Sequence, residues 1–295
     1  MKNLKYFLQF FCILFLFGVF KIVGIKFSRI ISENIMVMFG PIFRSKKIIF
    51  KNLSIAFPNF NENEKKQILK DMWINYGRIF AEYMFIKNFR QGSIGERNIN
   101  IENQYILENV KKDSKPVIFI SGHFNNFELM AMQIEKLGID LAAVYRPLNN
   151  KFLNPLMESI RKKYICKKQI KKGISGTKEL LLNFKKGTSI ALMIDQRVSE
   201  GIRVDLFNEK ALTTTIPAQF IKKFGAKIIP VHIERINVEK FNITFQDPIK
   251  FSKDTNIESI TYKLNNILEE MIKKNPSQWI WSHNRWKELN LFLFP

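Results

Sequence analysis

Residues 116–128 read Pro-Val-Ile-Phe-Ile-Ser-Gly-His-Phe-Asn-Asn-Phe-Glu, a short apolar run that leads into a polar turn. An apolar run of this length, closed by a turn, is typical of a strand that is buried on both faces of a sheet. Helical patterning follows at about 126–137. We therefore expect a strand that ends near Ser121 and places His123 just beyond its carboxyl end.

Two further apolar runs, 189–194 and 226–233, have the same character, and helical stretches at about 176–184 and 217–224 separate the runs. Strands that alternate with helices predict an α/β fold with a mainly parallel central sheet flanked by helices. In such sheets chemistry gathers beyond the carboxyl ends of the strands. We expect His123 and the pair Asp195-Gln196 to fall at that edge.

The amino terminus carries an uncharged apolar run, Tyr6–Phe20, between Lys5 and Lys21. Its 15 residues fall short of the ~20 that span a bilayer, unless the Lys21 amine reaches the interface. Basic residues on both sides favour an anionic leaflet. We interpret residues 1–30 as a membrane-anchoring helix, lying in or across the bilayer, and 31–295 as one cytoplasmic-side domain. A buried core helix is the alternative.

Lys and Arg number 47 against 26 Asp and Glu, a net charge of +21, which indicates a polyanionic partner. The densest cluster holds seven basic residues among the twelve of 161–172, with no acid. It suits an acidic protein or phosphorylated headgroups; a solvated, composition-driven run is the other reading. Aromatic residues are not interleaved with the cluster, which argues against single-stranded nucleic acid. The two cysteines have no metal-like spacing, so we expect neither a metal nor another cofactor.

His123 and Glu128 form the candidate catalytic pair. A carboxylate bonded to one ring nitrogen fixes the tautomer and leaves the other nitrogen as a base. No serine or cysteine nucleophile accompanies the pair, so the proton would come from a substrate hydroxyl. A histidine at a strand end can also be an ordinary polar residue, and this spacing occurs by chance.

The spacing His123-x4-Glu128 resembles the His-x4-Asp/Glu motif of glycerolipid acyltransferases, and the wider sequence resembles the bacterial lipid A biosynthesis acyltransferases. The blocks that carry the resemblance span most of the chain in the family's order: Asn52-Leu53, Phe57-Pro58, 121–128, 144–147 with Asn149-Asn150, 193–196, 212–217, Gly225-Ala226 with Pro230-Val231, and 279–287. The tail, 282–287, is only a loose match. The resemblance implies acyl transfer from acyl carrier protein to a hydroxyl of a phosphorylated, Kdo-bearing lipid A precursor at the bacterial inner membrane.

By that resemblance His123 is the general base and Glu128 orients its ring. Arg146 would contact phosphate or thioester, and Asp195 would bond the acceptor, support the His123 loop or cap a helix. Threonines before the helix at 217 suit phosphate binding, although capping explains at least one of them. The predicted substrate-binding residues are Asn126, Arg146, Arg161, Asp195, Gln196, Thr214 and Thr215.

Two other functions compete with this prediction. The same chemistry could acylate another lipid, such as a lysophospholipid, an ornithine lipid or a glycolipid. More remotely, the chain could be a non-catalytic protein that binds an anionic membrane or nucleic acid through its charge.

Overall fold

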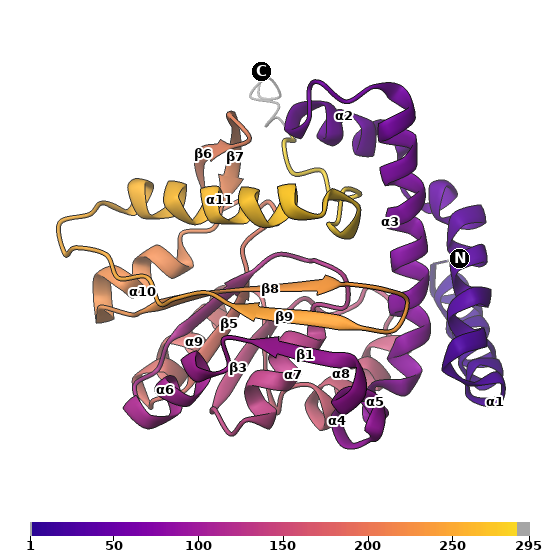
Figure 1. Cartoon of the computed structure of the whole chain (residues 1–295), viewed down its shortest axis with the longest axis horizontal. Helices are drawn as coiled ribbons and strands as arrows, with labels where there is room; N and C mark the ends of the chain where they lie inside the picture. Colours follow the sequence, from indigo (N-terminus) through magenta and orange to yellow (C-terminus); the bar gives the residue numbers. More distant parts are fainter. Residues whose placement is uncertain (1, 288–295) are drawn as a thin grey trace.

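A seven-stranded sheet forms the centre of the molecule in a computed structural model that describes residues 2–287 (Figure 1). Every pair of neighbouring strands is parallel except β8 and β9, which confirms the predicted mainly parallel α/β sheet. In spatial order the strands are β1 (Ile99–Glu102), β9 (Phe241–Phe245), β8 (Ile228–Arg235), β2 (Ile118–Ser121), β5 (Ser189–Met193), β3 (Leu141–Tyr145) and β4 (Lys168–Lys171).

The three strands predicted from apolar runs are the adjacent central ones, β8, β2 and β5. All four residues of β2 are buried, as expected for a strand covered on both faces. The predicted helices are also present as α7 (Glu128–Lys136), α9 (Ile174–Lys185) and α10 (Ile216–Phe224). The remaining elements are α2 (Lys46–Ala56), α5 (Ser93–Asn98), α6 (Tyr105–Asp113), α8 (Leu153–Tyr164), α11 (Ile257–Lys274), the short 3₁₀ turn η2 (Pro276–Gln278), and a separate hairpin of β6 (Ile202–Leu206) and β7 (Glu209–Thr213).

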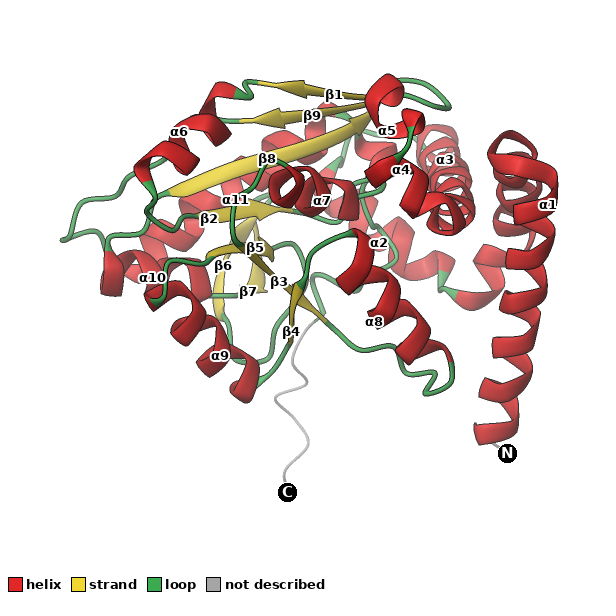
Figure 2. Ribbon diagram, turned by 90° about the horizontal axis from the view of Figure 1, so that it is seen from below, coloured by secondary structure: helices red, strands yellow, loops and turns green. Residues whose placement is uncertain are grey.

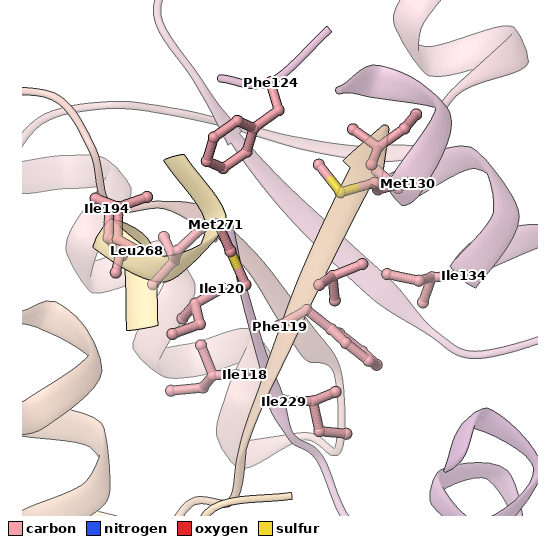
Figure 3. Packing of buried hydrophobic residues seen from close by; sticks show 14 of the residues in the cluster. Ile118, Phe119, Ile120, Phe124, Met130, Ile134, Ile194, Ile229, Leu268 and Met271 are labelled. Carbon is pink, nitrogen blue, oxygen red and sulfur yellow. The ribbon is translucent and has the colours of Figure 1, made fainter. Parts of the chain in front are cut away.

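Helices cover the sheet on both faces. Figure 1 shows α11 on one side and α6, α7 and α8 on the other. The close view of the core in Figure 3 shows alternate β2 side chains facing opposite ways. Phe119 points towards Ile134 of α7, whereas Ile120 points towards Leu268 and Met271 of α11. This period-two alternation of apolar side chains ties both helical layers to one strand.

Residues 62–91 form three consecutive helical pieces: α3 (Glu62–Glu82), a 3₁₀ turn η1 (Tyr83–Phe85) and α4 (Ile86–Gln91). Asn61 accepts hydrogen bonds from the backbone N–H groups of Asn63 and Glu64, while the Glu64 carboxylate accepts from the Asn61 N–H. This reciprocal capping fixes the start of α3.

The amino-terminal helix α1 (Lys2–Phe43) is longer than the predicted segment 1–30 and bends at Gly24, whose φ of 77° and ψ of 167° are not helical. Across the bend, the Ser28 hydroxyl donates to the Phe20 carbonyl at 3.0 Å. The second half runs beside α3 (Figure 1), where Gly77 lets the two backbones approach closely. Among residues 2–287, α1 alone is long and apolar enough to cross a membrane.

Much of the apolar surface of α1 is uncovered. Its exposed large apolar side chains are Leu4, Phe7, Leu8, Phe11, Phe15, Ile22, Phe27, Ile30, Met38, Phe39 and Ile42. The helix is nevertheless attached to the domain near its start, since the Asn150 amide donates to the Tyr6 carbonyl and Phe7 packs edge-on against Phe152. Figure 2 shows this part of α1 at the side of the domain beyond α8. A contiguous exposed apolar surface of this kind marks a lipid-facing or protein-facing region.

Candidate active site

His123 and Asp195 meet because β2 and β5 are adjacent and parallel. Ser121 pairs with Met193 in the register, and the Ile194 N–H extends the ladder by donating to the Ser121 carbonyl at 2.9 Å. Residues just beyond the two strands are therefore brought to the same sheet edge. His123 Nδ1 lies 2.7 Å from Asp195 Oδ1.

Asp195 is fully buried, and it holds the backbone of the turn at His123 as well as the imidazole ring. Its Oδ2 atom accepts the backbone N–H of His123 at 2.7 Å and the indole N–H of Trp279 at 2.9 Å. Burial alone would raise the pKa of Asp195, but the His123 charge and these hydrogen bonds lower it below its ordinary value. The carboxylate therefore stays ionised, opposite an imidazole whose side chain is 20% exposed.

This geometry assigns the tautomer of His123. An ionised carboxylate can only accept hydrogen bonds, so Nδ1 carries the proton and Nε2 presents its lone pair. The Gln196 amide nitrogen lies 3.4 Å from Nε2, and the Phe127 ring packs edge-on against the imidazole at 4.7 Å between centroids. A neutral imidazole oriented in this way can accept a proton at Nε2.

Glu128 does not hold the imidazole, which corrects the predicted pairing. Glu128 starts α7, and its Oε1 atom accepts from Arg161 of α8 at 2.6 and 2.8 Å while Oε2 accepts the Tyr83 hydroxyl at 2.9 Å. The carboxylate is thus directed towards α8 and η1, and Asp195 supplies the partner of His123. The sequence allowed this role for Asp195 as support of the His123 loop, which the structure bears out.

Arg161 is held in place by this ion pair. Burial would lower the pKa of its guanidinium, but the charge of Glu128 and then Tyr83 raise it. The guanidinium also lies over the Tyr145 ring, 5.9 Å from its centroid. A fixed, permanently charged guanidinium suits recognition of phosphate or carboxylate groups.

Asn126, a predicted substrate-binding residue, is buried and directed into the protein. Its side chain is 1% exposed and donates to Glu82 Oε2 at 3.0 Å. Thr215 is also buried, and its hydroxyl accepts from Gln219, while Thr214 accepts the Ile216 N–H at the start of α10. The Thr214 contact is a local cap at the start of α10, as the capping alternative expected, whereas the Thr215 hydroxyl contacts a side chain one turn further along the same helix.

Arg146, by contrast, is exposed and follows β3 at the same carboxyl edge. Lys172 follows the neighbouring β4 and donates its backbone N–H to the Tyr145 carbonyl at 2.8 Å. Burial and then the charge of Arg146 lower the pKa of Lys172. Arg197, just beyond β5, has a buried Nε atom with no hydrogen-bond partner.

Residues 276–287 complete the site, a contribution that sequence reasoning missed. Besides Trp279, His283 accepts the Arg197 N–H at Nε2 at 2.9 Å, and burial lowers the pKa of His283 to about 4. Arg285 is fully buried and donates to the Leu212 carbonyl. The only signal was membership of this segment in the resembling blocks, without a role for any residue.

Within residues 2–287, no group of three or more His, Cys, Asp or Glu side chains is arranged to hold a metal ion. Cys166 is buried beneath β3, where its thiol donates to the Leu141 carbonyl, and burial raises its pKa to about 12. Cys12 lies exposed on α1. At the sheet edge, the oriented imidazole of His123 lies among the cationic side chains described above.

Comparison with known proteins adds independent findings. The sequence model of a family described as bacterial lipid A biosynthesis acyltransferase matches residues 1–288. The chain is similar to the lipid A biosynthesis lauroyltransferase of Escherichia coli, with 24% identity over 250 residues, 83% of this chain and 79% of the relative. It is also similar to the lipid A biosynthesis myristoyltransferase of the same organism, with 20% identity over 240 residues, 80% and 73% of the two chains.

Among solved structures, the crystal structure of the 1-acyl-sn-glycerophosphate acyltransferase from Thermotoga maritima superposes with a TM-score of 0.40 and 13% identity. The superposition covers 87% of this chain and 100% of that one.

Proposed function

Because this chain belongs to the bacterial lipid A biosynthesis acyltransferase family, we propose that it transfers a fatty acyl chain from acyl carrier protein to a hydroxyl of a Kdo-bearing lipid A precursor. The observation that supports this most directly is the His123–Asp195 pair at an accessible sheet edge. Such a pair is a general base, which is what direct attack by a hydroxyl on a thioester requires.

In the proposed reaction, His123 Nε2 takes the proton of the acceptor hydroxyl as its oxygen attacks the thioester carbonyl. The tetrahedral intermediate then expels the thiolate of the donor, and the imidazolium returns the proton to that sulfur. Asp195 stabilises the imidazolium without taking its proton. The ester bond forms as the thioester bond breaks, and no covalent acyl-enzyme is needed.

The oxyanion of the intermediate needs hydrogen-bond donors. The backbone N–H groups of residues 123–126 already donate within the protein, to Asp195, Gly122, Gln278 and the Asn125 side chain in turn. The Gln196 amide, 3.4 Å from His123 Nε2, lies next to the atom where the hydroxyl would bind. We assign oxyanion stabilisation to Gln196.

Cations at the same edge suit the phosphates of the acceptor. Arg146, Lys172 and Arg197 follow the three neighbouring strands β3, β4 and β5, and the buried Arg197 Nε atom lacks a partner. A phosphate accepts several hydrogen bonds at once and would satisfy that donor. We assign headgroup binding to these three side chains and to Arg161, whose guanidinium lies over the ring of Tyr145, next to Arg146 in the chain.

We assign docking of the acyl donor, acyl carrier protein, to a basic patch on α8 and the β4 segment. The patch consists of Lys162, Lys163, Lys167, Lys168 and Lys171. All five are exposed. Two have acidic neighbours: Lys168 pairs with Asp140, and Lys171 lies 3.9 Å from Glu158. The remaining positive field would attract an acidic carrier protein and would weaken with added salt.

We assign contact with the bilayer to the exposed apolar side chains of α1 described above. Lys5, Lys21 and Lys26 are exposed on the same helix and would meet anionic headgroups. We propose that the protein lies at the inner membrane with its sheet on the cytoplasmic side, and the family's lipid substrate supports this location.

The function is tested by incubating the purified protein with acyl carrier protein that bears a labelled acyl chain and with a set of acceptors. We expect transfer to the Kdo-bearing lipid A precursor, and loss of transfer in His123→Ala with vesicle binding retained. The panel includes the precursor without Kdo, a lysophospholipid and an ornithine lipid. Transfer to one of the last two but not to the Kdo-bearing precursor would reject the proposed acceptor.

A further inference from the structure

Glu82, at the end of α3, is the centre of a buried polar network. The network joins α1 to the loop 123–128, which carries His123 and is called the catalytic loop below. Its carboxylate has no solvent exposure and accepts hydrogen bonds from three different segments. Arg29 Nε of α1 donates to Oε1 at 2.9 Å, and Asn126 Nδ2 of the 123–128 loop donates to Oε2 at 3.0 Å. Arg235 of β8 donates to both oxygens, at 2.7 and 2.9 Å.

Two cations, Arg29 and Arg235, face the Glu82 carboxylate, and Arg29 also lies 4.0 Å from the partly exposed Glu239. The exposed side-chain fractions are 1% for Arg29 and 3% for Arg235. Burial would raise the pKa of Glu82, but Arg235 and then Arg29 lower it, so the carboxylate is ionised. Removing one member of a buried charged network leaves its partners poorly satisfied, and they then move to find new contacts.

The catalytic loop depends on this network at two consecutive residues. Asn125 has a left-handed φ of 45°, and its side chain donates to Gln278 Oε1 at 2.6 Å. Gln278 is in turn held by the backbone N–H and carbonyl of Arg235. Asn126 is held by Glu82. Arg235 therefore controls both asparagines, one through its backbone and one through its side chain.

Arg29 is the contribution of the apolar helix to this arrangement. It lies on the second half of α1, where Glu33 contacts α3 close to Gly77. A segment that only attached the protein to lipid would need no buried arginine directed at the catalytic domain. An unpaired buried arginine is energetically costly. The pairing of Arg29 with Glu82 therefore couples the position of α1 against α3 to the conformation of the loop 123–128.

We infer that Arg29 and Glu82 are positioning residues, which make the docked α1 helix part of the framework that sets the His123 loop. The inference rests on the proposed function only where activity is the readout. Displacement of α1 from α3 removes Arg29 from Glu82, relaxes Asn126 and moves His123 from its productive place against Asp195.

The chain offers a matched control on the same helix. Glu33 of α1 accepts from Arg78 of α3 at 2.6 Å, an ion pair that joins the same two helices but does not contact the loop. Arg29→Met and Glu33→Gln therefore each remove one α1–α3 charge interaction, and only the first reaches Asn126.

Hydrogen–deuterium exchange of full-length protein in detergent micelles tests the inference without any substrate. Arg29→Met is expected to speed exchange of the backbone amides of 123–128, whereas Glu33→Gln leaves them at the wild-type rate. Asn126→Ala keeps the α1–α3 contacts and is expected to loosen the same amides, so it serves if Arg29→Met does not fold. Loop exchange at the wild-type rate in a folded Arg29→Met, or equal loosening in Glu33→Gln, overturns the inference. If Arg29→Met does not fold, unchanged exchange in Asn126→Ala overturns it.

Kinetics provide the second readout. A mispositioned base lowers kcat more than it raises KM, and a displacement of about 1 Å can reduce the rate by about 10²-fold. We expect Arg29→Met to show this pattern, with partial recovery in Arg29→Lys and wild-type kcat in Glu33→Gln. If the wild-type protein transfers no acyl chain to any acceptor, the proposed function fails while the exchange experiment still decides the positioning role.

Discussion

Trp279 donates its indole N–H to Asp195 Oδ2 at 2.9 Å, the same oxygen that accepts the backbone N–H of His123 at 2.7 Å. The other oxygen faces His123 Nδ1. The carboxylate is therefore fixed by donors from two segments of the chain, and its orientation dictates that of the imidazole. The effects expected of changes at Asp195 and Trp279 follow from this arrangement.

Replacement of Asp195 by Asn should nearly abolish transfer. The amide cannot stabilise an imidazolium and can donate to Nδ1, which would place the proton on Nε2. By analogy with the loss of an orienting carboxylate elsewhere, kcat should fall by about 10³–10⁴-fold. Steady-state transfer from labelled acyl carrier protein measures it. A variant within tenfold of wild type would exclude the His123–Asp195 pair as the base.

Trp279→Phe should have a smaller effect, because one of three donors to Asp195 is lost while the ring volume is largely kept. A hydrogen bond to a charged group contributes about 1.5–3 kcal/mol, so kcat should fall by about 10–100-fold. Trp281→Phe is the matched control, since its indole N–H donates to the Pro276 carbonyl and not to Asp195. Equal losses in the two variants would assign the effect to packing.

Glu128 and Arg161 should act as one unit. Each single change, Glu128→Gln or Arg161→Gln, breaks the same ion pair, so the double variant should be little worse than the worse single one. Glu128→Gln combined with Asp195→Asn should be closer to additive in activation free energy, because the two carboxylates hold different groups. Strong coupling of Glu128 to Asp195 and none to Arg161 would restore the predicted His123–Glu128 pairing.

Gly24→Ala tests the bend in α1. A φ of 77° with a ψ of 167° belongs to a region that is essentially restricted to glycine, so alanine should cost about 1–3 kcal/mol there. The added methyl group would meet no atom within 4 Å, so the cost is conformational. Gly18→Ala, also without neighbours within 4 Å but without that backbone conformation, should be neutral or stabilising. Thermal unfolding in micelles compares the two, and equal melting temperatures would show that the bend is not required.

Stability should fall as the pH drops from 6.5 towards 4, in part because of His232. Burial lowers the pKa of His232 to about 4 from an ordinary value of 6.5, and its ring packs against Phe124. The folded protein keeps this imidazole neutral while the unfolded chain binds a proton, so the stabilisation present above pH 6.5 is lost on acidification. His232→Phe should reduce the pH slope of the unfolding free energy in this window by about 1 kcal/mol per pH unit. Urea titrations between pH 4.5 and 7.5 measure it, and parallel slopes would contradict the assignment.

The parallel order of strands made part of the site predictable. Once the runs at 116–121 and 189–194 are parallel neighbours, His123 and Asp195 share an edge, and the sequence indicated as much. The pairing of His123 with Glu128 failed because short sequence separation was taken as proximity. Arg161, 33 residues beyond Glu128, binds that carboxylate instead of His123.

The unpredicted parts have a common cause. Strands β1 and β4 have only four residues each, with alternating or largely exposed side chains, so no continuous apolar run announced them. Asn126 looked like a substrate ligand from its place beside His123, and only the buried Glu82 reveals its structural role. Trp279 contacts a carboxylate 84 positions earlier, and no local pattern encodes such a contact.

That contact also has a consequence for biosynthesis. A ribosome that has passed Asp195 has produced both members of the dyad, yet the indole that donates to Asp195 follows 84 residues later. The Asp195 carboxylate of a nascent chain therefore lacks its indole donor until nearly the whole sequence has been made. Assembly of the site is consequently a late event in synthesis.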